Sequence, residues 1–498
     1  MTNFTETTIG IVGVSRDCFP ASLTKERKER VISACRKAGF EVTDIPVIIE
    51  NEQDAVKALR EAEIKRVNAV VVYLGNFGPE TPASLFISRF KGPVMICAAA
   101  EETKDNLING RGDAYCGMLN LSYSLNLRKR KVHIPEYPVG LADEIAVMIK
   151  NFIPIARIIL GLQALKVFSF GPRPQDFIAC NAPIKPLYDL GIEVMENSEM
   201  DLLDIFKKAE GDPGIPAIAQ EMQKELGKGN AYPDLLPKLA QYEIALKHFM
   251  KNNLGASRYA VFANKCWPSF ESFFGFVPCY INSRLASMGI PVACEVDMYG
   301  AVSEYMCTLA GGLPATLLDI NNTVPSDMLR EAGTSAEGYS QKDMFMGFHC
   351  GNTPKTCLHS NCSMKFQLIM KRLMEPDGEP DITRGTLEGR LKPGQCTIFR
   401  LQGRADTTLS SYIAQGNILD IDPKSFGSIG IFAVKDLGRF YRHVLIGKNF
   451  PHHAAIAFTH AGHALYGALQ LLGVTDVNTP LPSGLRYPEE NIFQPTLQ

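Results

Sequence analysis

The chain has 498 residues with 46% hydrophobic and 21% charged side chains, a balance typical of a globular protein with about two to four domains. The formal net charge of −2 gives no indication of nucleic acid or anionic lipid as a partner. With no stretch of 18 apolar residues, no signal peptide at residues 1–10 and 13 cysteines without repeated CxxC spacing, the sequence predicts a reduced, cytoplasmic protein with no membrane partner.

The first 160 residues alternate short apolar runs with longer amphipathic segments. The apolar runs predict buried strands at residues 8–14, 40–45, 69–74 and 93–98. The amphipathic segments predict helices at residues 23–38 and 51–61. This alternation is typical of a parallel, doubly wound sheet. The first strand is not followed by GxGxxG, so we do not expect a dinucleotide site there.

A second alternating unit follows a long apolar helix predicted at residues 142–163. Its strands are expected at residues 164–170, 191–195, 259–263 and 291–294. After residue 330 the pattern changes to short strands separated by turn signals, with one more helix at residues 462–472. Strands in this part are expected at residues 345–352, 390–401, 430–434 and 441–446. The pattern predicts a β-rich barrel or sandwich.

The predicted fold class is therefore α/β, with two doubly wound parallel-sheet domains followed by a β-rich, barrel-like C-terminal domain. The predicted boundaries are residues 1–160, 161–330 and 331–498.

Two carboxylates in the second unit suggest chemistry. Residues 291–319 are expected to form strand, turn, helix and strand, which places Glu295 and Asp319 at the carboxyl ends of two strands. That edge of an open parallel sheet is where ligands bind, and two acids there repel each other unless a cation lies between them. A divalent metal is the usual solution. A structural alternative is that both carboxylates cap helices.

Four of the nine histidines gather at positions 452, 453, 460 and 463. Neutral imidazole is a good ligand for divalent metals, and carboxylates are the harder ligands beside it. Two carboxylates and one histidine, open to substrate oxygens, would suit Mn²⁺ or another divalent ion. Any one of the four histidines is also compatible with a purely structural role.

Three segments carry a resemblance. Ala293-Cys-Glu-Val-Asp-Met-Tyr-Gly-Ala-Val302 and Gly312-Leu-Pro-Ala-Thr-Leu-Leu-Asp-Ile320 resemble the metal-binding segment of the L-fucose isomerase and L-arabinose isomerase superfamily. The acid pair, 24 positions apart (319 − 295), resembles that of the fucose isomerase branch. The run His452-His-Ala-Ala-Ile-Ala-Phe-Thr-His-Ala-Gly resembles that branch's C-terminal motif, with His452 where the family has Asn.

The resemblance implies an intramolecular aldose–ketose isomerase acting on an L-fucose-like or L-arabinose-like monosaccharide through a cis-enediol. It implies Mn²⁺ or another divalent metal held by Glu295, Asp319 and His453, with both acids also moving protons. It further implies a homo-oligomer, either a hexamer or a trimer.

Five residues are candidates for holding the sugar. Trp267 is one because sugar faces stack on aromatic rings, and the others lie in loops that the resemblance places at the site: His349, Asn352, Arg16 and Asn76. His349 could instead be a further metal ligand, or hydrogen-bond a turn. Trp267 could be core, and Arg16 an exposed loop charge. The alternative functions are a metal-dependent sugar epimerase or aldolase, a non-catalytic sugar-binding protein, and a glycosidase that uses Glu295 and Asp319 without a metal.

Overall fold

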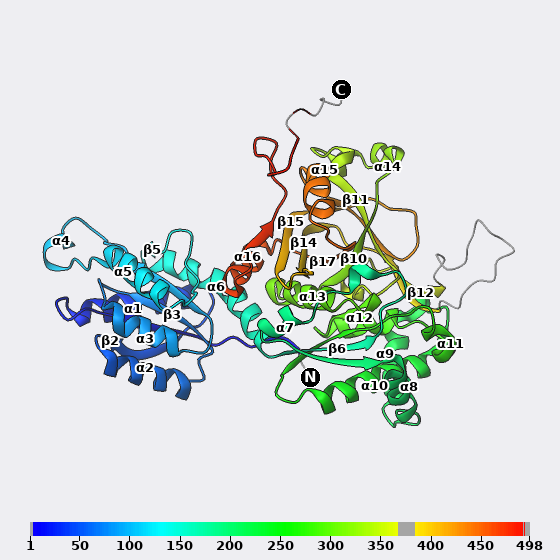
Figure 1. Cartoon of the computed structure of the whole chain (residues 1–498), viewed down its shortest axis with the longest axis horizontal. Coiled ribbons are helices and arrows are strands. Elements are labelled where there is room, and N and C mark those ends of the chain that lie inside the picture. Colours follow the sequence, from blue (N-terminus) through cyan, green and yellow to red (C-terminus); the bar gives the residue numbers. More distant parts are fainter. Residues whose placement is uncertain (1–2, 367–383, 492, 494–498) are drawn as a thin grey trace. The chain divides into compact units, whose positions relative to one another are not determined.

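The computed structural model describes residues 3–366, 384–491 and 493 (Figure 1). Its contacts divide the chain into two compact units. The smaller unit contains Thr5–Gly161 and His463–Gly473, and the larger contains Leu162–Gly462 together with both chain ends. The predicted boundary after residue 330 falls inside the larger unit.

The smaller unit is built on a parallel sheet whose described strands have the order β2-β1-β3-β4-β5. These strands are β1 (Ile9–Val14), β2 (Thr43–Ile49), β3 (Ala69–Leu74), β4 (Val94–Ala99) and β5 (Val139–Gly140). Every residue of β1, β3 and β4 is buried, as expected for strands covered on both faces by helices. The predicted doubly wound sheet is confirmed.

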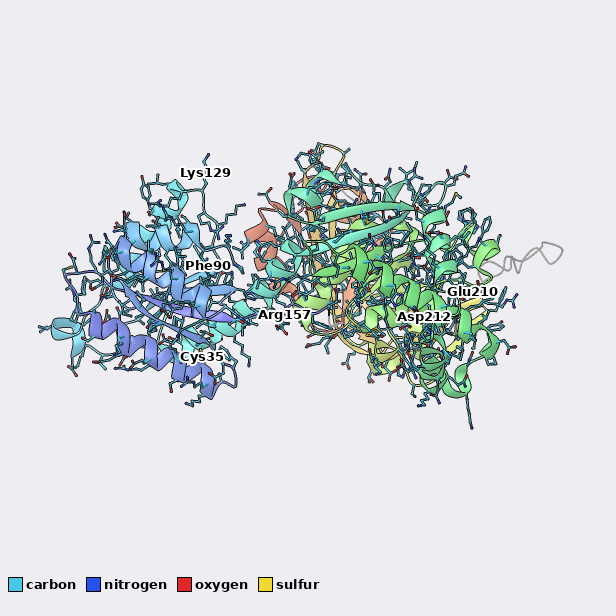
Figure 2. The ribbon with its side chains drawn as sticks, turned by 90° about the horizontal axis from the view of Figure 1, so that it is seen from below. Cys35, Phe90, Lys129, Arg157, Glu210 and Asp212 are labelled. Carbon is cyan, nitrogen blue, oxygen red and sulfur yellow. The ribbon has the colours of Figure 1, made fainter. Side chains whose placement is uncertain are left out.

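Helices cover both faces of this sheet. With this strand order, the right-handed rule for parallel crossovers places α1 on one face and the helices after β2, β3 and β4 on the other. The contacts agree, since α2 packs on α3 and α3 on α5. These helices are α1 (Ala21–Lys37), α2 (Glu52–Ile64), α3 (Glu80–Arg89), α4 (Asn106–Asn109) and α5 (Ala114–Leu127). Figure 2 shows Cys35 on α1 and Phe90 at the end of α3 to either side of the sheet.

The long helix α6 (Ala142–Gln163) follows β5. Among the described residues it is the one helix that is long and apolar enough to cross a bilayer, judged by length and composition alone. Inside the protein, 56% of its most apolar window is buried, as in the core helix of a globular protein. Helix α16 (Gly462–Leu472) has the predicted bounds and belongs to the same unit.

The larger unit begins with a second parallel sheet, of order β7-β6-β8-β9. Its strands are β6 (Leu165–Gly171), β7 (Glu193–Ser198), β8 (Tyr259–Ala263) and the two-residue β9 (Val292–Ala293). Its longer helices are α8 (Glu199–Lys208), α9 (Ile215–Leu226), α10 (Leu236–Asn253), α12 (Cys279–Ser287) and α13 (Met298–Gly311).

The β-rich part contains a closed ring of strands. Within the part of the chain that the structure describes, β16, β11, β10, β17, β14 and β15 pair in that order, each pair antiparallel, and β15 pairs back to β16. β12 and β13 extend the sheet beside β16, and β18 beside β15. The strands are β10 (Thr316–Asn322), β11 (Met344–His349), β12 (Ser363–Phe366), β13 (Arg384–Arg390), β14 (Gly394–Gly403), β15 (Leu409–Leu419), β16 (Ser428–Ala433), β17 (His453–Ala457) and β18 (Asp476–Asn478). The predicted barrel-like domain is confirmed.

One topological expectation is wrong. The strand that carries Asp319 does not join the parallel sheet that precedes Glu295; instead, β10 pairs antiparallel with β11 and β17 inside the barrel. The two acids therefore come from two different sheets. A short apolar run fits a buried strand in either kind of sheet, so the pattern does not choose between them.

Helix α13 links the two sheets. Met298 to Leu309 are all buried, and the helix contacts β6 and β8 on one side and β10, β14 and β17 on the other. Figure 1 shows the barrel strands above α13 and β6 below it. One hydrophobic core runs from Phe168 and Phe262 of the parallel sheet to Ile456 of the barrel.

The strand predicted at residues 441–446 is also wrong. Tyr441–Ile446 forms a π-helical turn that continues α15 (Leu437–Phe440). The buried residues here are Leu437, Phe440, Val444 and Leu445. The last three lie three, seven and eight positions after the first, which is the spacing of one face of a helix.

Candidate metal centre

The two predicted ligands of the barrel lie on neighbouring strands. Asp319 of β10 is paired directly with His453 of β17 in antiparallel register. Directly opposed residues of an antiparallel pair project on the same side of the sheet. As a result, Asp319 Oδ1 lies 3.5 Å from His453 Nε2.

Glu295 reaches the same place from the other sheet. Its Oε2 lies 3.6 Å from His453 Nε2. Glu295 and Val296 both have a left-handed backbone, with φ of 61° and 58°, although neither is glycine. Such conformations cost on the order of 1–3 kcal/mol each and persist where the surroundings over-determine them. Here Val296 N donates to the Asn264 carbonyl at 2.9 Å, and this bond holds the turn after β9.

The ring of His453 is held from behind by Asp297. Asp297 Oδ2 lies 2.8 Å from His453 Nδ1, and Arg400 donates two hydrogen bonds to the same carboxylate, at 2.6 and 2.9 Å. All three side chains are buried. Burial alone would raise the pKa of Asp297, but Arg400 and then His453 outweigh it and hold that pKa well below its usual range. Asp297 is thus ionised and accepts the Nδ1 proton, which directs Nε2 toward Glu295 and Asp319.

A cation is expected between the two acids. Among the described residues, neither His453 Nε2 nor Asp319 Oδ1 has a hydrogen-bond partner. Burial would lower the pKa of His453, yet the hydrogen bond with Asp297 outweighs it and raises that pKa well above its usual value. A proton on Nε2 and a metal ion bound to Nε2 would each offset the negative charge of the two carboxylates. A divalent metal that binds there would therefore replace the proton.

Three more donors lie around this place. His349 accepts a hydrogen bond from Cys350 N at Nδ1, 2.9 Å away, and burial lowers its pKa, so its imidazole is neutral and fit for ligation. His452 Nε2 is 3.2 Å from Glu295 Oε2. The donors form two overlapping groups, each with ligand atoms within 4.8 Å of one another: Cys180, Glu295, His452 and His453; and Asp319, His349 and His453.

The remaining predicted site residues are placed differently. Asn352 is buried three positions after His349, and its Oδ1 has no partner among the described residues. Trp267 is half-buried in the loop after β8, the loop whose Asn264 carbonyl holds Val296. Arg16 and Asn76 belong to the smaller unit, where they follow β1 and β3 and where Arg16 N donates to Asn76 Oδ1 at 2.9 Å. Contact of these residues with a sugar stays a prediction.

Sequence reasoning missed Cys180, Asp297 and Arg400. Asp297 caps α13 by accepting from Gly300 N at 2.8 Å, and it is also buried and binds His453. Arg400 carried a usable signal, because a charge inside the apolar run Thr397-Ile-Phe-Arg-Leu401 must be paired when the strand is buried. A single cysteine in a polar loop carries no such signal.

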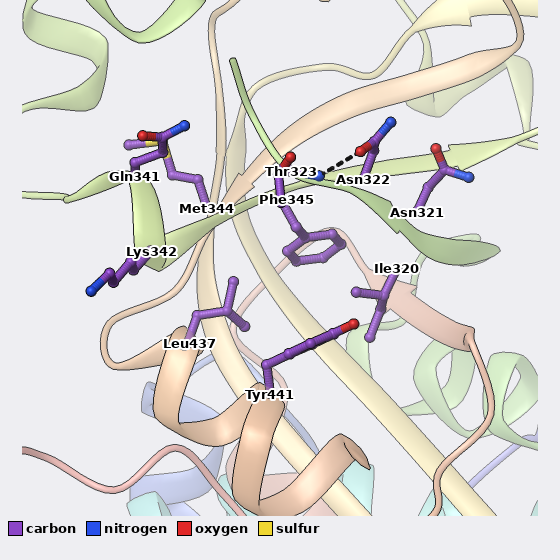
Figure 3. A pocket seen from close by; sticks show the side chains of 11 residues that line it. Ile320, Asn321, Asn322, Thr323, Gln341, Lys342, Met344, Phe345, Leu437 and Tyr441 are labelled. Carbon is purple, nitrogen blue, oxygen red and sulfur yellow. Dashed lines mark hydrogen bonds between the residues drawn. The ribbon is translucent and has the colours of Figure 1, made fainter. Parts of the chain in front are cut away.

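The strand that carries Asp319 continues into a separate pocket. Ile320, Asn321 and Asn322 line a cavity of about 560 Å³ together with Phe345 and Tyr441 (Figure 3). The cavity lining includes none of the candidate metal ligands. β10 thus carries Asp319 toward the centre and presents amide side chains to this second space.

Fold and centre together define an α/β protein with a closed barrel and, between the parallel sheet and the barrel of its larger unit, a cluster of side chains that could hold a metal ion. Residues 10–163 match the model of the fucose/sulfoquinovose isomerase N-terminal domain, and residues 347–478 match that of the L-fucose isomerase C-terminal domain. The chain therefore belongs to the fucose isomerase-like family, as the resemblance predicted. This membership supports an enzyme that interconverts aldose and ketose sugars.

Curated relatives agree with this assignment. The chain is 22% identical to a sulfoquinovose isomerase of Priestia megaterium over 431 residues, which cover 85% of this chain and 88% of the relative. It is 26% identical to a sulfoquinovose isomerase of Clostridium sp. (strain MSTE9) over 310 residues, 58% of this chain and 59% of the relative. A sulfoquinovose isomerase of Alkalicoccus urumqiensis is 22% identical over 333 residues, 65% of this chain and 68% of the relative.

Proposed function

We propose that this protein is a metal-dependent aldose–ketose isomerase whose metal is held by Glu295, Asp319 and His453. The observation that carries the proposal is the fully buried Nε2 of His453, which has no hydrogen-bond partner among the described residues and lies 3.5 and 3.6 Å from the two carboxylates. Two carboxylates and a neutral imidazole fit Mn²⁺ or a similar divalent ion. When bound, this metal would polarise the sugar carbonyl and stabilise the negative charge of the enediolate.

The residues of the chain move the protons. Burial would raise the pKa of Glu295, but His452 and then His453 outweigh it and lower that pKa, so Glu295 is ionised and able to accept a proton. One of Glu295 and Asp319 takes the C2 proton of the open-chain aldose, which gives a cis-enediol. The other carboxylate serves the exchange of protons between the oxygens and C1. His452 is partly exposed beside Glu295 and connects that carboxylate with solvent.

The substrate is proposed to be a monosaccharide aldose. The names of the relatives favour a sulfonated aldose over the neutral L-fucose-like or L-arabinose-like sugar expected from the sequence. A sulfonate requires a cation. Arg173 lies in the loop after β6 that also carries Cys180; one terminal nitrogen of its guanidinium donates to the Pro174 carbonyl at 3.3 Å, and its Nε has no hydrogen-bond partner in the described part of the chain. Parallel assays with a sulfonated hexose and with L-fucose decide between the two substrate classes.

The deciding experiment removes the metal from the full chain with EDTA and measures ketose formation. Activity should disappear and return with Mn²⁺; activity that survives complete metal removal contradicts the proposal. Carrying out the reaction in D₂O separates an isomerase from an epimerase or aldolase, because isomerisation keeps the carbon count and places deuterium at C1 of the ketose. We also propose a cytoplasmic homo-oligomer, which light scattering of the purified protein tests for its oligomeric part.

A further inference from the structure

Cys180 places a sulfur atom at the centre. The residue ends a short helical turn (Ile178–Cys180) in the loop after β6 and is buried. Its Sγ lies 3.4 Å from Glu295 Oε2 and 3.8 Å from His453 Nδ1. One ligand atom from each of Cys180, Glu295, His452 and His453 lies within 4.8 Å of the other three.

The surroundings of this thiol differ from those of a cysteine that fills a core. Cys396, for example, lies in the hydrophobic core on β14. The contacts given for Cys180 are a carboxylate and an imidazole, both from the candidate centre. A second observation points to a ligand beside Glu295 Oε2, the atom that both Cys180 Sγ and His453 Nε2 approach. Nε2 is the other ring nitrogen from the one nearest Sγ; it is fully buried, has no hydrogen-bond partner among the residues described and is directed between two carboxylates.

We propose that Cys180 supplies a thiolate to the metal centre, so that the centre offers sulfur as well as nitrogen and oxygen. This inference rests on the proposed metal-dependent function. When the metal binds, the S–H bond of Cys180 breaks, the sulfur electron pair forms the metal–sulfur bond, and the proton passes to solvent. No oxidant or reductant is involved.

A sulfur ligand changes which metals the protein prefers. Thiolate is a soft ligand that favours Zn²⁺ and Co²⁺, whereas carboxylates favour harder ions such as Mn²⁺. The Cys180 sulfur should therefore raise the affinity for Co²⁺ and Zn²⁺ much more than the affinity for Mn²⁺. Without the sulfur, the affinities for Co²⁺ and Zn²⁺ should exceed the affinity for Mn²⁺ by a smaller factor.

Co²⁺ titration of the metal-stripped full chain tests the proposal without any assay of activity. Visible d–d bands report that Co²⁺ is bound, and a near-ultraviolet charge-transfer band reports a cobalt–thiolate bond. The wild type should show both, and Cys180→Ser should keep the visible bands, lose the near-ultraviolet band and bind Co²⁺ at least about tenfold more weakly. Cys18→Ser removes an exposed thiol of the smaller unit and should match the wild type.

The outcomes separate this inference from the proposed function. Visible bands without a charge-transfer band in the wild type overturn the role of Cys180 and leave the metal centre intact. A charge-transfer band that persists in Cys180→Ser overturns it as well. The absence of any Co²⁺ spectrum in the wild type overturns the metal centre itself. If Cys180→Ser does not fold, the near-ultraviolet band is compared between the wild type and Cys180→Ala instead, and its presence or absence still tests the role of Cys180.

Discussion

Asp319 and His453 face each other across β10 and β17, with Oδ1 and Nε2 3.5 Å apart, and Glu295 completes the group from a different sheet. The barrel therefore determines the spacing of two donors, and the contact between the sheets determines the third.

Replacing either carboxylate with its amide should abolish most of the activity. Glu295→Gln and Asp319→Asn each remove a proposed metal ligand and a proposed proton-transfer group, so kcat should fall by about 10²-fold or more while the circular dichroism spectrum is unchanged. Asp327→Asn, an exposed change at the start of α14 (Ser326–Glu331) in the same unit, is the matched control and should retain wild-type turnover. Wild-type kcat in either amide variant would mean that the centre lies elsewhere.

Asp297→Asn should damage both stability and metal binding. It leaves Arg400 buried without its anion, a loss that typically costs about 3–5 kcal/mol. It also frees the ring of His453, and loss of such an outer partner typically lowers metal affinity about 10–100-fold. Urea unfolding measures the first effect and calorimetric Mn²⁺ titration the second. An Asp297→Asn protein with wild-type metal affinity would show that Asp297 does not position His453.

Glu304 should make the protein less stable as the pH rises. Burial raises the pKa of this side chain to about 8, and its Oε2 has no hydrogen-bond partner among the described residues. The folded state therefore keeps a proton that the unfolded state releases above its ordinary pKa. Stability is complete below that ordinary pKa and declines as the pH rises through about 8, by an amount on the order of a few kcal/mol.

Glu304→Gln removes this titration and keeps the shape of the side chain. The free energy of unfolding in urea, measured at about pH 6 and about pH 9, should change less in Glu304→Gln than in the wild type. Glu193→Gln, an exposed change on β7, should follow the wild-type profile. Parallel profiles for the wild type and Glu304→Gln would show that Glu304 does not carry the pH dependence.

With the proposed metal bound, its removal should lower thermal stability, because an ion held by Glu295 and Asp319 binds only the folded state. A free metal concentration of about 100 times the dissociation constant stabilises a fold by about 2.7 kcal/mol. Differential scanning calorimetry with and without EDTA measures the shift in Tm. A double variant, Glu295→Gln with Asp319→Asn, should melt at the same temperature in both buffers; a shift of wild-type size in it would mean that a different site holds the ion.

Much of this arrangement could be predicted from the sequence. The parts that could not be predicted have one physical cause in common. The sequence allows Glu295, Asp319 and His453 to be identified, because each ends or begins a short apolar run next to a recognisable motif. The pairing of β10 with β17 could not be predicted from the sequence, because an apolar run of this length fits a parallel or an antiparallel sheet. The apolar run around Arg400 indicates that this charge is paired but does not name its partner, and nothing local marks Cys180. Both residues make their contacts with elements more than a hundred positions away.

Helix α13 gives the centre one more property. Because it is buried between β8 of the parallel sheet and β17 of the barrel, it sets the spacing across which Glu295 meets its two partners. The affinity for the proposed metal should therefore depend on how closely the parallel sheet and the barrel pack against α13. A cavity opened in α13, as by Val302→Ala or Leu309→Ala, would weaken metal binding from a distance, although neither side chain carries a donor atom.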